Sequence, residues 1–495
     1  MVFIKRIKRG DHVYLAEVKS VREGGKVKHK FIRYVGKEID GKTVLSGSID
    51  RAQITKVSVY GPLLVLHDVA TRLGLFEIFE EQAQYVLSLV YAHCIEPGSL
   101  VSIQKWYERT DLQHLLGLEN VTYDKLLGAL DYLDGREKEL QHQLYAAVKK
   151  EFDLKPDRLF YDVTNIYFYG SCCPLAKKGY NKDKSRRNQV QIGLAVTRNE
   201  KIPIFHKVFE GNISDARTIR HLFDDFEFNQ KAWLVWDRGV TSKDNILDAK
   251  RAGFHVMCGV SLNAKLKRII DEELDTQPIV NFKNRVVLTK TTLFAKQMRY
   301  SYDGIPGYLI ICYNEKEKVA LKEERYKRVQ ESYEKIKNNK PVSGNLKRYF
   351  CYNKVDQRAI AEAEEYDGVS AIFSTKRLPV DELLHAYFQK DVVEKAFKSL
   401  KSTLEISPIR HWLTERVKSH IFICYIAYFL LSVLEYQLRS LNITASNAID
   451  QLKTVYRVHL TDPKTKNNFI KTVMLTKEQE QILKTVNKKL LKCSQ

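Results

Sequence analysis

The sequence lacks the patterns that would direct it into or across a membrane. No long apolar region follows the start of the chain, so no signal peptide is expected. The longest apolar run, Ile421 to Leu434, is broken by Ser432 and is short for a membrane span, so it suits a buried helix. Neither a basic amphipathic helix nor a lipidation signal is found, which argues against a membrane as partner.

Cysteine spacings typical of zinc proteins are missing as well. The eight cysteines form no Cys-x-x-Cys pair and show no Cys/His ligand spacing, so a zinc site is not expected. Scattered free thiols fit a reducing cytoplasm. With 495 residues and a hydrophobic content of 44%, the chain is sufficient for two or three folded domains.

Acidic side chains are scarce relative to basic ones. The chain has 81 Lys and Arg residues against 60 Asp and Glu residues, which gives a net charge of +21. This balance indicates a polyanionic partner, with nucleic acid first.

The order of expected elements divides the chain into four regions. Short β-like runs and glycine-containing turns predict a small β module over residues 1–57. Apolar residues at helical spacing predict a helical region over 58–152, which is a candidate for reading DNA although no helix-turn-helix pattern names its contact residues. A mixed α/β domain is expected over 153–440, and a basic helical tail over 441–495.

The α/β region follows the order β-β-β-α-β-α-β, which predicts a mixed sheet flanked by helices. An insertion over about 264–365 interrupts this order; it begins with strand-like runs and continues with an exposed Lys- and Glu-rich helix. The sheet pattern returns at Asp367 to Thr375, and Pro379 then opens the helix that carries Glu394.

Two aspartates lie in strand-like sequence of this region. Asp162 lies inside the first strand and Asp237 ends the fourth. A carboxylate near a core strand is unfavourable unless it is paired or binds a cation. For Asp237 the alternative is a turn residue paired with Arg238, and for Asp162 it is a solvent-facing carboxylate bonded to Thr164.

A third carboxylate lies among cations in the segment from Tyr387 to Lys401. On one α-helix, at about 100° per residue, Tyr387, Lys390, Glu394 and Lys401 share an arc of roughly 60°. The alternatives are a packing aromatic and a solvated charged face. Asp391, about 60° from Glu394, competes as the third ligand.

Together, Asp162, Asp237 and Glu394 are oxygen ligands of the kind that Mg²⁺ or Mn²⁺ prefers. Two such ions can activate a nucleophile and stabilise the leaving oxygen of a phosphodiester. The geometry requires two adjacent strands and a helix that crosses them, and the expected order supplies these elements.

The residues also carry a family resemblance. Over residues 155–435 the chain resembles DDE transposases of bacterial insertion sequences, which have a ribonuclease-H-like core. The matching motifs are Tyr161-Asp162-Val163-Thr164, Asp237-Arg238-Gly239, and the signature Y-x2-R-x3-E-x6-K through Tyr387, Lys390, Glu394 and Lys401. Further matches are Gly179 to Asp183, Gln191, Gly211 to Asp215, and Arg410-His411. Lys390 stands where the signature has Arg; it keeps the charge but loses the planar fork.

The resemblance implies a fold, an activity and partners. The fold is a ribonuclease-H-like mixed sheet with the β-rich insertion before the last catalytic helix. The activity is Mg²⁺-dependent cleavage of DNA at the ends of an insertion sequence and joining of those ends to target DNA. The partners are double-stranded DNA, namely the terminal inverted repeats and the target, and a second copy of the chain in a synaptic dimer. The expected location is the bacterial cytoplasm, with association to the nucleoid when bound.

The resemblance also gives roles to individual residues. Asp162, Asp237 and Glu394 would hold the metal ions, and Tyr387, Lys390 and Lys401 would contact phosphates. The basic segment that contains Lys182, Arg186 and Arg187 is a plausible backbone clamp, with a solvated loop as the alternative. Other functions consistent with these motifs are a structure-specific ribonuclease-H-like nuclease and a non-catalytic DNA-binding descendant of a transposase.

Overall fold

The computed structural model of the chain describes residues 2–10, 12–23, 26–39, 42–45, 52–170, 172–179, 187–225, 232–276, 278–289, 291–342, 344–463 and 468–493. The chain divides into two compact units. The first comprises Met1–Val69, Leu100–Tyr123 and Gln437–Gln495, and the second comprises Ala70–Ser99 and Asp124–Tyr436. Both units are discontinuous in sequence, whereas the ranges expected from the sequence are contiguous.

The first unit contains two antiparallel sheets. One is a four-stranded meander of β1 (Val2–Arg9), β2 (His12–Glu23), β3 (Lys26–Ile39) and β4 (Lys42–Leu45). The other pairs β5 (Gln53–Val59) with β18 (Tyr456–Thr461), which in turn pairs with β19 (Asn468–Thr472). The expectation that residues 441–495 are helical throughout is therefore wrong, because two strands of that tail complete a sheet with β5. This pairing joins residues some four hundred positions apart.

Short helices accompany these sheets. They are α1 (Gly61–Arg72), α4 (Leu100–Glu108), α5 (Leu112–Leu116), η6 (Leu438–Leu441), α17 (Ala445–Leu452), α18 (Lys477–Val486) and α19 (Leu490–Cys493). Asp111, before α5, is fully buried and is paired with Arg457 of β18 at 2.6 Å. A capping box fixes the start of α18, since Thr476 and Gln479 bond to each other's backbone amides.

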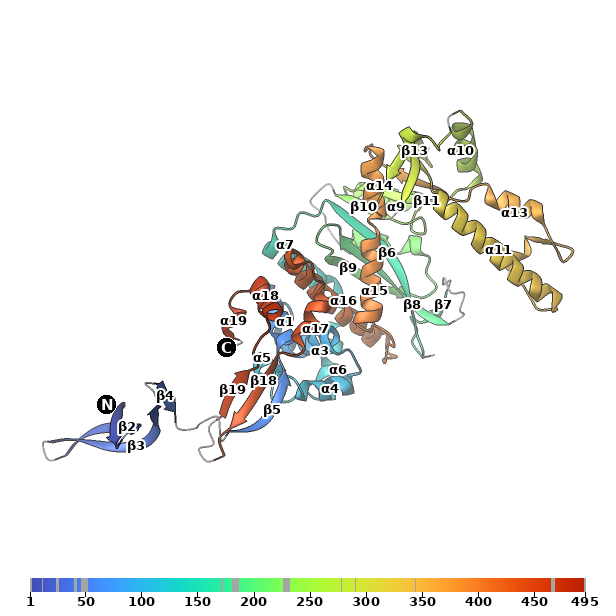
Figure 1. The fold of residues 1–495 in the computed structure, drawn as a ribbon. Coiled ribbons are helices and arrows are strands. Elements are labelled where there is room, and N and C mark those ends of the chain that lie inside the picture. Colours follow the sequence, from blue (N-terminus) through green and yellow to red (C-terminus); the bar gives the residue numbers. More distant parts are fainter. Residues whose placement is uncertain are drawn as a thin grey trace. The chain divides into compact units, whose positions relative to one another are not determined.

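The second unit is an α/β fold around a ten-stranded mixed sheet (Figure 1). Its strand order is β12-β13-β14-β17-β11-β10-β6-β8-β7, with β9 also paired to β8. The strands are β6 (Arg158–Tyr167), β7 (Lys177–Lys178), β8 (Asn188–Thr197), β9 (Pro203–Glu210), β10 (Trp233–Trp236), β11 (His255–Val260), β12 (Arg285–Val287), β13 (Thr292–Tyr302), β14 (Ile305–Tyr313) and β17 (Val369–Ser374). The expectation of a mixed sheet flanked by helices is confirmed.

Helices cover both faces of this sheet. One face carries α8 (Arg220–Asp225), α9 (Lys243–Arg251) and α10 (Ala264–Thr276), whose apolar residues share a core cluster with β6, β10 and β11. The other face carries α7 (Glu137–Phe152), α14 (Val380–Phe388), α15 (Asp391–Lys398) and α16 (Thr414–Gln437). The strand β8 is almost entirely buried, as expected for a strand covered on both sides.

Further helices lie before and within this α/β region. They are α2 (Leu75–Ile78), η2 (Glu80–Gln82), α3 (Ala83–Ile95), α6 (Tyr123–Leu133), η3 (Asp215–Arg217), η4 (Phe282–Asn284), α11 (Glu315–Lys337), α12 (Gly344–Lys347) and α13 (Gln357–Glu364). A two-stranded ribbon joins β15 (Phe350–Cys351) to β16 (Lys354–Val355).

The segment expected to be an insertion contributes directly to the central sheet. Its strands β12, β13 and β14 extend the sheet through β17, which pairs with β11. The exposed Lys- and Glu-rich helix expected from the sequence is α11. Arg325 of α11 bonds to the carboxylate of Asp367, a buried ion pair that ties this helix to the entry of β17.

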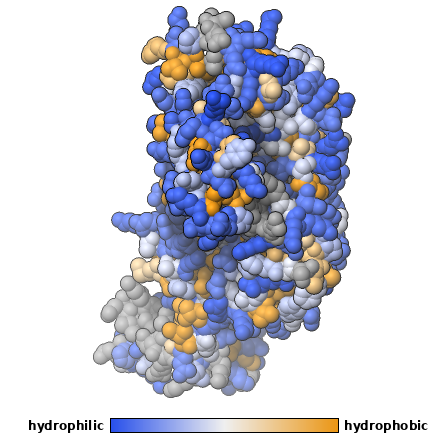
Figure 2. Space-filling view, turned by 90° about the vertical axis from the view of Figure 1, so that its right-hand side faces the viewer, coloured by the Kyte–Doolittle hydropathy of each residue, from blue (hydrophilic) through white to orange (hydrophobic). Residues whose placement is uncertain are grey.

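The long apolar helix α16 is a core element of the second unit. With the turn after it, it is long and apolar enough to cross a membrane, but 89% of its most apolar stretch is buried inside the protein. Figure 2 shows a face of the molecule on which hydrophilic residues predominate and hydrophobic residues form small scattered groups.

Candidate active site

The two aspartates expected to act together lie on neighbouring strands, Asp162 within β6 and Asp237 directly after β10. Strands β6 and β10 are parallel, and Tyr161 is paired with Trp236. Asp162 and Asp237 come next on strands that lie about 4.8 Å apart. Because Tyr161 and Trp236 are buried in the core cluster on one face, both aspartates belong to the opposite face, where α15 packs against β6.

The segment from Tyr387 to Lys401 is not the single α-helix that the sequence suggests. It comprises the end of α14, the helix α15 and a π-helical turn, η5 (Ser399–Thr403). Between the helices, the amides of Lys390 and Val393 bond three residues back, to Tyr387 and Lys390. The break has a packing cause: α14 buries its apolar face against β13, whereas α15 packs against β6 and β8.

Despite this break, two polar side chains of the segment reach Asp237. The Tyr387 hydroxyl donates to Oδ1 of Asp237 at 3.2 Å. Nζ of Lys390 lies 3.1 Å from the same oxygen and 3.4 Å from the Tyr387 hydroxyl. The partner of Asp237 is therefore Lys390; Arg238 contributes only its backbone amide, at 2.8 Å.

These contacts keep Asp237 ionised. Burial by itself would raise its pKa, but the Lys390 charge and the hydrogen bonds that Asp237 accepts outweigh burial, so the pKa lies below its usual value. Burial, together with the Asp237 charge, raises the pKa of Tyr387, so its hydroxyl stays protonated and can donate. The Lys390 ammonium therefore lies where a cation can pair with the carboxylate of Asp237.

A glycine that the sequence interpretation missed makes room for this arrangement. Gly259 of β11 lies beside Asp237, because Cys258 is paired with Trp236. A Cβ at Gly259 would lie 2.6 Å from the Tyr387 hydroxyl and 3.3 Å from Oδ1 of Asp237. Thr241, also missed, fixes the turn after Asp237, since its hydroxyl bonds to the Gly259 carbonyl at 2.7 Å. No motif marked either residue, because their roles depend on strand register.

Glu394 lies in the first turn of α15 and is exposed. Within the described part of the chain it has no hydrogen bond or ion pair. Its competitor Asp391 lies 3.3 Å from Nζ of Lys395, one turn later. The apolar side of the same helix is buried through Val393 and Phe397, as the spacing predicted.

Lys401 reaches the strand that carries Asp162. Its Nζ lies 2.7 Å from the hydroxyl of Thr164, two residues after Asp162 and on the same side of β6. The threonine named as an alternative partner of Asp162 therefore has a lysine of η5 as a partner.

A fourth carboxylate lies close to this edge of the sheet. Asp215, in the turn η3, accepts a hydrogen bond from Gln191 of β8 at 3.5 Å. Its Oδ2 lies 3.2 Å from the position that a Cβ of Gly239 would take. The turns that follow β9 and β10 therefore meet, and Asn245 joins them by donating to the carbonyls of Ala216 and Val240.

The donors at this edge suit a divalent cation of the magnesium type. All are carboxylate oxygens, and Asp237 already faces a cation. Two other groups among the described residues have three ligand atoms within 4.8 Å of one another, and neither includes Asp162, Asp237 or Glu394. Among the described residues, these three carboxylates are therefore not drawn together to that distance.

Comparison with known families decides the class of protein. Residues 153–430 match the model of the transposase DDE domain. The chain belongs to this family. Membership in the DDE transposase family implies the use of a divalent metal ion, in agreement with the carboxylate donors.

Two further comparisons of this DDE transposase concern curated proteins and solved structures. No curated protein matches the chain. Among solved structures, the piggyBac transposase synaptic complex with hairpin DNA matches with 14% sequence identity and a TM-score of 0.39, and the match covers 80% of each chain. A TM-score this low establishes neither a shared fold nor a shared function.

The basic segment of the DDE transposase is described only in part. Lys182 and Arg186 lie outside the described residues. Arg187 is exposed, and its guanidinium lies over the ring of Tyr167 at 5.9 Å, at the end of β6. This places one basic side chain at the far end of the strand that carries Asp162.

Proposed function

We propose that this chain is a DNA transposase that cleaves DNA at the ends of an insertion sequence and joins them to target DNA. One observation carries the proposal: the register of β6 and β10 gives Asp162 and Asp237 neighbouring positions, and α15, the helix that contains Glu394, packs against β6. Family membership supports the reaction class.

The topology supports a ribonuclease-H-like core. The strands β6, β8 and β9 are antiparallel neighbours, with the two-residue β7 between β6 and β8 along the chain. The strands β10 and β11 then follow in parallel on the other side of β6. Helices link β9 to β10 and β10 to β11. This is the order that the resemblance implies.

Asp162, Asp237 and Glu394 would hold the metal ions. When bound, Mg²⁺ or Mn²⁺ would lower the pKa of the attacking hydroxyl and stabilise the leaving oxygen. The chain's own part is to orient these carboxylates and, at Asp237, to favour the ionised form. For Asp237 this follows from its low pKa and from the hydrogen bond that Tyr387 donates.

Lys390, Tyr387 and Lys401 would bind DNA phosphates next to the carboxylates. In cleavage, water attacks phosphorus and a 3′-OH leaves. In joining, that 3′-OH attacks a phosphorus of the target and displaces the 3′-oxygen of the adjoining target nucleotide. Each lysine that neutralises a phosphate releases counterions, so affinity should fall as salt rises. Lys390 would transfer from Asp237 to a phosphate once a metal ion takes its place at the carboxylate.

The net charge of +21 suits contact with long stretches of duplex DNA. The partners we propose are the terminal inverted repeats, the target duplex and a second copy of the chain in a synaptic dimer. The setting we propose is the bacterial cytoplasm, at the nucleoid.

A strand-transfer assay tests the proposal. The substrates are duplexes ending in the inverted repeats that flank the coding gene, incubated with Mg²⁺ and a target plasmid. We expect cleavage and joining by the unmodified chain, and loss of both with Asp237→Ala or Glu394→Gln. Asp391→Asn is the matched control, because it alters a carboxylate of the same helix turn and should stay active.

The other outcomes identify the alternatives. Cleavage without joining would favour a structure-specific nuclease, and binding without either reaction would favour a non-catalytic descendant. Full activity of Glu394→Gln with an inactive Asp391→Asn would move the third ligand to Asp391.

A further inference from the structure

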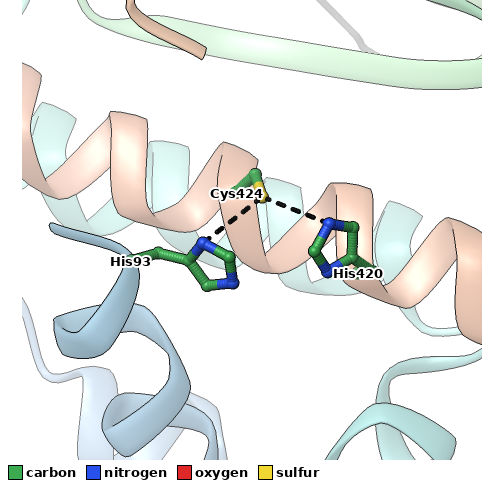
Figure 3. Close-up of side chains that lie close together, drawn as sticks. All are labelled: His93, His420 and Cys424. Carbon is green, nitrogen blue, oxygen red and sulfur yellow. Dashed lines mark hydrogen bonds between the residues drawn. The ribbon is translucent and has the colours of Figure 1, made fainter. Parts of the chain in front are cut away.

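A second group of potential metal ligands lies away from the carboxylates, between α3 and α16 (Figure 3). His420 and Cys424 are one turn apart on α16, and His93 comes from α3. The Cys424 sulfur lies 3.9 Å from Nδ1 of His93 and 4.0 Å from Nε2 of His420. The three ligand atoms all lie within 4.8 Å of one another, so they face a common point.

The spacing of these atoms is close to that of a zinc site. With Zn–N of about 2.0–2.1 Å and Zn–S of about 2.3 Å, tetrahedral ligands place sulfur and nitrogen roughly 3.6 Å apart. The distances of 3.9 and 4.0 Å exceed this by a few tenths of an ångström. A small side-chain movement would therefore close the site around an ion.

The protonation states of the histidines also suit a metal. Burial lowers the pKa of His93. Burial is also the main cause that lowers the pKa of His420 to about 3, and the nearby His93 is the next largest cause. Both imidazoles are therefore neutral near pH 7, which is the form that ligates. Burial raises the pKa of Cys424, so its thiol stays protonated until a bound cation displaces the proton.

The competing interpretation is a set of ordinary core hydrogen bonds. Nδ1 of His93 lies 3.0 Å from the Leu404 carbonyl, and Nε2 of His420 lies 3.3 Å from the Ile406 carbonyl. If these nitrogens carry protons, they donate to the carbonyls and cannot bind metal. If each ring instead carries its proton on the other nitrogen, the lone pairs of Nδ1 of His93 and Nε2 of His420 face the thiol. A backbone carbonyl oxygen then lies close enough to serve as the fourth ligand.

We propose that His93, His420 and Cys424 bind one Zn²⁺, with a backbone carbonyl of Leu404 or Ile406 completing the coordination. Binding exchanges the thiol proton for the metal: the S–H bond breaks, the proton leaves to solvent and a Zn–S bond forms. One thiolate and two neutral imidazoles select zinc over magnesium. This proposal departs from the expectation, drawn from cysteine spacing, that the chain has no zinc site.

The ion would have a structural role for the catalytic segment. Leu404 and Ile406 are fully buried and follow directly after η5, the turn that carries Lys401. A metal held by α3 and α16 would anchor this segment to both helices. The site shares no residue with the proposed catalytic carboxylates and does not depend on the proposed transposition chemistry.

Cobalt binding tests the site, because a thiolate ligand gives Co²⁺ a strong charge-transfer absorption that oxygen ligands do not. The full-length chain is stripped with a chelator and titrated with Co²⁺, followed by displacement with Zn²⁺. We expect this absorption to saturate at one ion per chain and to be lost in Cys424→Ser. Cys94→Ser is the matched control: this buried thiol is the next residue after His93, bonds to the Ala427 carbonyl at 3.6 Å, and should leave the absorption unchanged.

Zinc X-ray absorption of the unmodified chain keeps the proposal testable if Cys424→Ser does not fold. A shell of one sulfur and two imidazoles supports the site. A shell of oxygen ligands alone, no stoichiometric zinc, or an undiminished cobalt band in Cys424→Ser would overturn it. Because the carboxylates give no thiolate band, failure here leaves the proposed function untouched.

Discussion

Gly259→Ala should disturb the active site by adding one methyl group. The new Cβ would lie 2.6 Å from the Tyr387 hydroxyl, 3.1 Å from the Arg238 amide nitrogen and 3.3 Å from Oδ1 of Asp237. The first distance is far shorter than a van der Waals contact, so the hydroxyl must move away. Tyr387 would then lose its hydrogen bond to Asp237, which is 3.2 Å long.

The size of the effect follows from these contacts. A hydrogen bond to a charged group contributes about 1.5–3 kcal/mol, and inserting a methyl into a packed site costs about 1–3 kcal/mol. We expect Gly259→Ala to lower the free energy of unfolding by about 2–3 kcal/mol. Displacing a positioning group by about 1 Å should lower the cleavage rate roughly a hundredfold.

A double-mutant cycle separates the hydroxyl from other causes of destabilisation. Tyr387→Phe removes the atom that the new Cβ would meet. Urea unfolding of the single and double variants should therefore show that Gly259→Ala is much less destabilising in the Tyr387→Phe background than with tyrosine present. Cleavage should stay low in both backgrounds, because the hydrogen bond to Asp237 is missing in each. Equal destabilisation in the two backgrounds would refute the placement of the hydroxyl over Gly259.

Three further changes probe the charges. Lys390→Gln removes the cation that offsets the effect of burial on the pKa of Asp237, so this pKa should rise. The acidic limb of the pH–rate profile for cleavage should then move to higher pH. Lys401→Ala should lower DNA affinity and reduce the slope of log affinity against log salt by about 0.9. Arg325→Ala leaves the buried Asp367 without its ion-pair partner and should lower the free energy of unfolding by about 3–5 kcal/mol, as measured in urea.

Each change has a matched control. Lys390→Arg keeps the charge and should leave the acidic limb in place. Lys395→Ala removes an exposed lysine of α15 that is already paired with Asp391, and the salt slope should change less. Arg328→Ala breaks an exposed pair with Glu324 and should alter stability by about 0–1 kcal/mol. If a control variant changed the measured pH limb, salt slope or free energy of unfolding as much as its test variant, the corresponding charge assignment would be wrong.

The sequence was sufficient for the catalytic sheet because its strands are apolar runs with clear ends. The order β-β-β-α-β-α-β and the exposed helix α11 follow from local patterns of this kind. It was also sufficient to place Asp162 inside one strand and Asp237 at the end of another, since each carboxylate stands in an apolar run.

Pairing between strands that are distant in the chain could not be predicted from the sequence. Strands β18 and β19 read as part of a helical tail because their partner β5 lies near the other end of the chain. The break before α15 was missed because Gln389 and Lys390 carry no helix-ending signal; packing of α14 and α15 on different strands sets it. Gly259 and His93 act only through neighbours in space, so spacing along the chain could not identify them.

The central claim is that Asp162, Asp237 and Glu394 hold the metal ions. Anomalous diffraction from crystals of the chain with terminal-repeat DNA and Mn²⁺ tests it most directly. The account predicts manganese peaks bounded by Asp162, Asp237 and Glu394, with Lys390 moved from Asp237 to a phosphate. Manganese bound at Asp391 instead of Glu394, or no manganese at Asp162 and Asp237, would contradict it.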